Sequence, residues 1–84
     1  MFEEPKYLRD ALTDVLFHLR FEDAHLALFY LGVAAAHRSR VRIDIGKHMA
    51  IYEVRDMIRD GRHEAAARAI YPVVELLNAQ PVAA

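Results

Sequence analysis

The stretch RSRVRIDIG, residues 38–46, is the only part of the chain in which apolar residues alternate strictly with polar ones. Successive side chains of a β-strand point to opposite faces, so Val41, Ile43 and Ile45 would share one face. The pattern predicts one short strand over residues 40–45. A lone strand leaves its backbone groups unpaired, and the sequence offers no second strand. We therefore expect it to pair with the same strand of a second copy, which predicts a homodimer.

Helical spacing governs the residues before this stretch. Apolar side chains recur every three or four positions from Leu8 to Leu19, which predicts an amphipathic first helix. The stripe falters at residues 20–23, where Asp23 can cap a new helix, so we expect a break there. The second helix, residues 24–37, is apolar nearly all round. It must be buried on most sides, either at a subunit interface or among the other helices.

Two further helices are expected after the strand. The first, about residues 47–60, is followed by Gly61, which suits the left-handed residue that closes a helix. The last begins near residue 62 or 63, and Pro72 inside its pattern predicts a kink or a restart there. Residues 79–84 would form a frayed tail. The 84-residue chain is thus predicted to be a single, mainly α domain with two helices on each side of one short strand.

Positive charge is concentrated on and beside the predicted strand. Residues 1–36 carry three Lys or Arg against six Asp or Glu, whereas residues 37–48 carry four Lys or Arg against Asp44 alone. A homodimer would bring two such patches together. We expect its interface to contain Val41, Ile43 and Ile45 from the strand and Leu28 and Leu31 from the second helix.

Residues 40–77, taken as strand, helix, Gly turn and helix, resemble the ribbon-helix-helix superfamily of dimeric DNA-binding repressors and antitoxins. The resemblance rests on Arg40-Val-Arg-Ile-Asp-Ile45, on the fifteen residues from there to Gly61, and on Arg62-His-Glu-Ala-Ala-Ala-Arg-Ala-Ile70. It implies a small homodimeric transcriptional regulator that reads the DNA major groove with paired strands. The family unit would occupy residues 38–78, after a helical N-terminal half at residues 1–37.

The resemblance assigns base reading to the outward side chains of the strand, Arg40, Arg42 and Asp44. Arg can donate two hydrogen bonds to guanine, and Asp can accept one from cytosine. As in that family, the N-terminus of the last helix, near Arg62 and His63, would hold a phosphate. A charged outward face is also what any half-exposed strand shows. The predicted DNA-binding residues are Arg38, Arg40, Arg42, Asp44, Lys47, Arg62 and His63.

A self-comparison offers a different fold and a different function. At an offset of 42, residues 12–31 align with residues 54–73 and place apolar positions on apolar positions. The alignment describes two αα-hairpins, an all-α arrangement of four helices in which residues 40–45 are a linker. Gly61-Arg-His-Glu-Ala-Ala also looks like the second helix of a tetratricopeptide unit, and such hairpins are scaffolds for protein binding. The alternative function is therefore a protein-interaction module, an adaptor or an inhibitor.

The sequence contains few of the residue patterns that metal sites and enzyme active sites require. Glu22-x-x-His25 has the spacing of a carboxylate-bridged metal site, but no second Glu-x-x-His exists, so we expect no metal and no cofactor. The only Ser and the only Thr, Ser39 and Thr13, lie in no catalytic motif, and enzyme function is not expected. The sequence predicts neither a signal peptide nor a membrane span, and its lack of cysteine fits a cytoplasmic protein.

Overall fold

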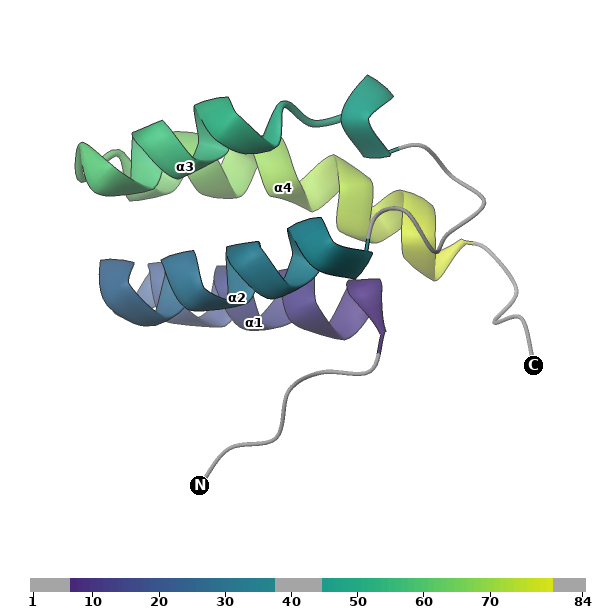
Figure 1. Ribbon diagram of the computed structural model, residues 1–84, viewed down its shortest axis with the longest axis horizontal. Coiled ribbons are helices and arrows are strands. Elements are labelled where there is room, and N and C mark those ends of the chain that lie inside the picture. Colours follow the sequence, from purple (N-terminus) through teal and green to yellow (C-terminus); the bar gives the residue numbers. More distant parts are fainter. Residues whose placement is uncertain (1–6, 38–44, 80–84) are drawn as a thin grey trace.

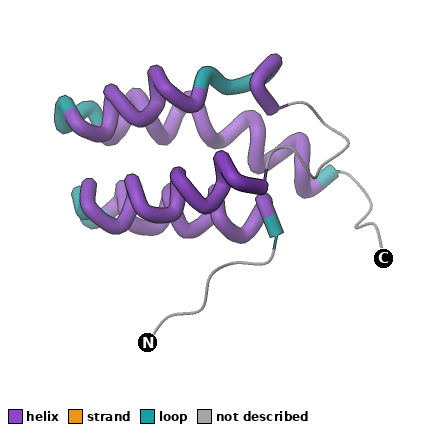
Figure 2. The backbone as a smooth tube through the Cα atoms, viewed as in Figure 1, coloured by secondary structure: helices purple, strands orange, loops and turns teal. Residues whose placement is uncertain are grey.

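Residues 7–37 and 45–79 are described by the computed structural model, in which they form four α-helices and one short 3₁₀ turn (Figures 1 and 2). The elements are α1 at Leu8–Arg20, α2 at Ala24–His37, the 3₁₀ turn η2 at Ile45–Lys47, α3 at Ile51–Arg59 and α4 at His63–Asn78. α1 packs against α2 and α4, and α3 packs against the same two helices. The described residues therefore form a ring of two antiparallel hairpins, which confirms the prediction of a mainly α fold.

The turn between α1 and α2 is closed by backbone hydrogen bonds around a left-handed residue, Glu22, at φ 56°. The Glu22 N–H donates to the Leu19 carbonyl at 3.1 Å, and the Asp23 N–H donates to the His18 carbonyl at 3.0 Å. This pair of bonds is the Schellman motif. The Asp23 carboxylate then accepts from the Leu26 N–H at 3.1 Å and caps α2. The predicted break at residues 20–23 and the predicted cap at Asp23 are both confirmed.

The turn between α3 and α4 uses the same motif with a different residue. Gly61 takes the left-handed position at φ 78°. Its N–H donates to the Ile58 carbonyl at 3.1 Å, and the Arg62 N–H donates to the Met57 carbonyl at 2.8 Å. Glycine adopts this conformation without steric cost because it has no Cβ. The role predicted for Gly61 is therefore confirmed.

The two hairpins share one buried framework, but its offset is 39 residues rather than 42. Gly61 lies 39 residues after Glu22 and occupies the equivalent place in its turn. At this offset six pairs of buried residues coincide: Leu12 and Ile51, Val15 and Val54, Leu19 and Ile58, Ala27 and Ala66, Leu31 and Ile70, Ala34 and Val73. The sequence alignment missed this offset by three residues. Because three residues are nearly one helical turn, the apolar faces overlap at either offset.

The predicted strand over residues 40–45 is not supported. Its residues 40–44 lie outside the described residues, and the last one, Ile45, begins η2 instead. The part of the chain that the structure describes contains no strand. A 3₁₀ turn pairs its backbone groups locally, so it needs no second strand. The predicted pairing of strands across a homodimer therefore has no support in the described residues.

The third helix differs from the sequence prediction, and for the fourth helix the structure contradicts the restart at Pro72, one of the two expected outcomes. α3 begins at Ile51 rather than near Lys47, because Lys47 ends η2 and Met49 in the connection is buried, with 3% of its surface exposed. α4 continues through Pro72 as one helix and is not restarted there. Pro72 is exposed. Inside a helix, proline destabilises the fold because it lacks an N–H donor and its ring crowds the carbonyl four residues earlier.

The core fills the space between the hairpins with aliphatic side chains. The largest side chains that are fully enclosed are Leu12, Val15, Val54, Ile58, Ile70 and Val73. Leu31, predicted to lie at a dimer interface, is 2% exposed and belongs to this core, and Leu28 packs half-buried against it. Among the described residues no helix has both the length and the apolar character that crossing a bilayer requires.

Candidate functional site

Five aromatic rings on hairpin one, which is α1 with α2, form a continuous cluster that we call the aromatic face: Phe17, His18, Phe21, Phe29 and Tyr30. The ring centre of Phe17 lies 5.1 Å from that of Phe21 and 5.2 Å from that of His18. His18 stacks on Tyr30 at 5.3 Å with an interplanar angle of 4°, and Tyr30 meets Phe29 at 5.1 Å. The contacts thus run from the end of α1 across to α2.

Three members of the aromatic face are open to solvent although they are large and apolar. Phe21 exposes 68% of its surface, Phe17 53% and Phe29 44%, whereas Tyr30 beneath them exposes 6%. Phe17 and Phe21 are one turn apart, and Leu8, Leu12 and the other buried positions of α1 lie on the opposite side of the helix. Single exposed rings are common on folded proteins, whereas an exposed apolar cluster is a candidate interaction surface.

The charge beside the aromatic face is negative. Asp10 and Asp14 precede Phe17 on the same side of α1, and α2 carries no Lys, Arg, Asp or Glu. Burial raises the pKa of the Asp14 carboxyl above its ordinary value, His18 lowers it again in part, and Asp10 adds to the rise. Asp14 makes no ion pair within the described residues. Within the described residues the carboxylate therefore has no ion-pair partner, and His18 is the group that favours its charged form.

The cations of hairpin one lie toward α4 instead. Arg20 lines a pocket between α1 and α4, and Arg9 belongs to the same side of α1 by helical spacing. Arg9 also reaches the Asp10 carboxylate at 3.7 Å, with both side chains largely in solvent. Such exposed pairs contribute at most about 1 kcal/mol. Neither arginine neutralises Asp14.

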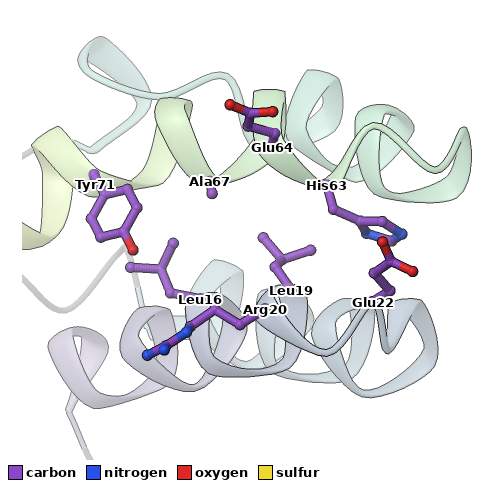
Figure 3. Close-up of a pocket in the computed structure, with 8 residues that line it drawn as sticks. All are labelled: Leu16, Leu19, Arg20, Glu22, His63, Glu64, Ala67 and Tyr71. Carbon is purple, nitrogen blue, oxygen red and sulfur yellow. The ribbon is translucent and has the colours of Figure 1, made fainter.

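The pocket between α1 and α4 has a volume of about 270 Å³ (Figure 3). Leu16, Leu19 and Ala67 supply its apolar wall, and its other lining residues are Arg20, Glu22, His63, Glu64 and Tyr71. Figure 3 shows His63 and Glu22 pointing toward one another, while Arg20 and Glu64 extend away. Among the described residues the buried Nδ1 atom of His63 has no hydrogen-bond partner.

The polar groups of this pocket do not converge on one point. Only His63 and Glu22 approach each other, and they come from the two opposite walls. Within the described residues no three His, Asp or Glu side chains are grouped so that they could hold a metal ion. The Glu22-x-x-His25 motif thus acquires no further ligand there. The pocket therefore contains one imidazole nitrogen without a partner among the described residues, and its charged groups do not indicate a class of ligand.

The predicted DNA-binding residues are only partly described. Arg38, Arg40, Arg42 and Asp44 lie outside the described residues. Lys47 is exposed in η2, at one end of α3, and Arg62 is exposed beside His63 at the other end (Figure 1). Nine residues of helix, about 14 Å, separate those ends. The structure therefore does not bring Lys47 together with Arg62 and His63.

The predicted dimer interface is also divided. Val41 and Ile43 lie outside the described residues, and Ile45 begins η2.

Sequence reasoning also missed the aromatic face, although one signal for it was present: Phe17 and Phe21 interrupt the polar side of an amphipathic helix. Comparison of the chain with protein families, with curated proteins and with solved structures gives no match.

Proposed function

We propose that this chain is a helical protein-interaction module that binds its partner through the aromatic face. The observation that carries the proposal is the exposure of Phe17, Phe21 and Phe29, which ring contacts through His18 and Tyr30 join into one cluster on a folded helical hairpin. Aromatic residues are enriched at protein interfaces, where they dominate the binding energy. The exposed parts of these rings leave water only when a partner covers them, which favours binding.

The rest of hairpin one is built to hold these rings in place. His18 and Tyr30 lie between the exposed phenylalanines and join α1 to α2 by a parallel stack. The Schellman turn at Glu22 and the Asp23 cap fix the position of Phe21 relative to the start of α2. A preorganised surface of this kind loses little conformational entropy when a partner binds.

The test is photo-crosslinking with p-benzoylphenylalanine in place of Phe21, in the cells that make the protein. Tyr52 provides a matched control, because it is 67% exposed, compared with 68% for Phe21, and lies on α3 against Arg55. We expect a discrete adduct with a protein at position 21 and none at position 52. Equal adducts at the two positions, or none at position 21, would contradict the proposal.

A second candidate is the predicted DNA-binding regulator, which the N-terminus of α4 favours. Arg62 is exposed there and makes no side-chain cap, and the N–H groups at the start of a helix can bind a phosphate. Binding to a selected duplex should weaken steeply with salt and weaken further in Arg40→Ala/Arg42→Ala. Fluorescence anisotropy measures both effects. Binding that is unaffected by these substitutions would exclude the assigned residues.

A further inference from the structure

We propose that the aromatic face receives an amphipathic helix of a partner protein, with apolar side chains on the phenylalanines and a Lys or Arg over Asp14. This inference rests on the proposed function and adds the chemistry of the partner. Asp10, Asp14, Phe17 and Phe21 are spaced by four, three and four residues, which places them along one side of α1. The row is about 16 Å long, or three turns of a docked helix.

Phe29 supplies the second side of the docking surface. It comes from α2, and its ring is linked to Phe17 through Tyr30 and His18. The exposed rings therefore do not lie along one helix alone but span the seam between two. A helix that lies along such a seam can place anchors at i, i+3, i+4 and i+7 against both sides.

The sign of the partner's charge follows from the groups around the seam. α2 has no charged Lys, Arg, Asp or Glu side chain, and Arg9 and Arg20 lie on the α4 side of α1. Asp14 is half-buried and makes no ion pair within the described residues, and His18 favours its charged form only in part. A partner that covers it must either supply a cation or leave a carboxylate desolvated, which is costly.

A second copy of this chain is a poor occupant for the same surface. In a second copy, the side of α1 that carries Phe17 and Phe21 also carries Asp10 and Asp14 and no Lys or Arg. Parallel pairing of two α1 helices would place Asp14 near Asp14. Antiparallel pairing would press each Asp14 against the other copy's phenylalanines without a cation. A single docked helix avoids both costs.

The experiment uses a fluorescent synthetic helix of Leu and Lys, about 14 residues long, and the same peptide with Glu at every Lys position. We expect the Lys peptide to bind the intact chain with a dissociation constant of about 1–100 μM and the Glu peptide to bind at least tenfold more weakly. Phe21→Ala should weaken the Lys peptide by about tenfold or more.

Three matched substitutions separate contact from charge. Asp14→Asn should weaken the Lys peptide several-fold and flatten its salt dependence, because it removes the proposed ionic contact. Glu53→Gln removes an exposed carboxylate from α3, and Tyr52→Ala removes an exposed ring from the same helix. Both should leave the affinity within about twofold, since neither residue lies on the seam.

The possible failures of the two proposals can be distinguished. Equal binding of the Lys and Glu peptides, both lost in Phe21→Ala, would overturn the charge inference and leave the docking function standing. Absence of peptide binding, together with a crosslink from position 21 to another protein, would overturn the docked-helix inference and would likewise leave the docking function standing. A crosslink only to a second copy would overturn the inference in favour of self-association. No crosslink and no peptide binding would remove both proposals.

Discussion

At the left-handed position of its turn, hairpin one carries Glu22 with φ 56°, and hairpin two, which is α3 with α4, carries Gly61 with φ 78°. Both turns make the same pair of backbone hydrogen bonds. The equivalent buried positions then follow one another at the same offset of 39 residues. The comparison shows that the hydrogen-bond pattern and the buried framework are common to both hairpins, while the residue that suits the turn best is present in only one.

The surfaces of the two hairpins differ more than their cores. In hairpin two, Glu64 pairs with Arg68 at 2.7 Å, Asp56 pairs with Arg55 at 3.2 Å, and Arg55 also covers the ring of Tyr52. Hairpin one instead combines clustered rings with an unpaired carboxylate, Asp14. Hairpin one also pairs Arg9 with Asp10, so the clustered rings beside half-buried Asp14, and not ion pairing alone, locate the proposed binding surface there.

The largest effect should come from equivalent core positions. Leu19→Ala and Ile58→Ala each remove a buried side chain that is 4% or less exposed, beside the turn of its hairpin. We expect each to lower the free energy of unfolding by about 2–5 kcal/mol, as urea denaturation followed by circular dichroism would show. Because the hairpins share one core, both variants should unfold in a single transition. Two transitions would show that the hairpins fold separately.

A second contrast is Pro72, which at the common offset corresponds to Val33. Val33 is buried in α2, whereas Pro72 is exposed inside α4 and offers no N–H to its helix. Pro72→Ala should restore one helical hydrogen bond and raise the free energy of unfolding by about 1–3 kcal/mol. Thermal denaturation measures the gain, with Pro81→Ala beyond α4 as the control. An unchanged melting temperature would mean that surrounding contacts already offset the proline.

The turns can be exchanged to test their equivalence. Glu22→Gly should stabilise hairpin one by about 0.5–1 kcal/mol, because a non-glycine residue is strained at positive φ. Gly61→Ala should destabilise hairpin two by about 1 kcal/mol for the same reason. A Cβ at Gly61 would meet no atom within 4 Å, so the whole effect is conformational. Chemical denaturation of both variants gives the two signs, and equal signs would contradict the shared motif.

Local backbone chemistry was the part of the fold that the sequence allowed us to predict. The cap at Asp23 and the left-handed Gly61 each depend on a few neighbouring residues, and both were found where predicted. The offset between the hairpins depends on which apolar faces meet, and helical periodicity alone leaves a shift of one turn undecided. Strict alternation predicted a strand, but Ile45 adopts a local turn because alternation does not by itself supply a pairing partner.

The candidate site was missed for a different reason. Phe17 and Phe21 break the amphipathic pattern of α1, yet an exposed ring in sequence is no evidence of a cluster. Only the packing of α2 places Phe29 and Tyr30 beside them. Most of the residues that were predicted to bind DNA are close together in sequence, at residues 38–47. Arg62 was predicted with them but lies after the far end of α3.

The smallest effect concerns Asp14 and its equivalent, the exposed Glu53. Burial raises the pKa of Asp14 in the folded protein, so the folded state binds the proton more tightly than the unfolded state does. Stability is therefore gained as the pH falls through the raised pKa and is lost above it. At pH 7, Asp14→Asn should stabilise the fold by less than about 1 kcal/mol, because water still screens this half-buried group.

The pH dependence of the stability gained in Asp14→Asn shows whether the gain comes from the charge of Asp14. The advantage of Asp14→Asn over the parent should shrink as the pH is lowered through the raised pKa of Asp14, because the parent carboxyl is then neutral as well. Glu53→Gln should show no comparable gain at pH 7, since its side chain is exposed. If Asp14→Asn is instead less stable than the parent at pH 7, the attraction between His18 and the Asp14 carboxylate stabilises the fold more than burial of the carboxylate destabilises it. A gain in stability with a loss of peptide binding would show that the carboxylate serves the partner rather than the fold.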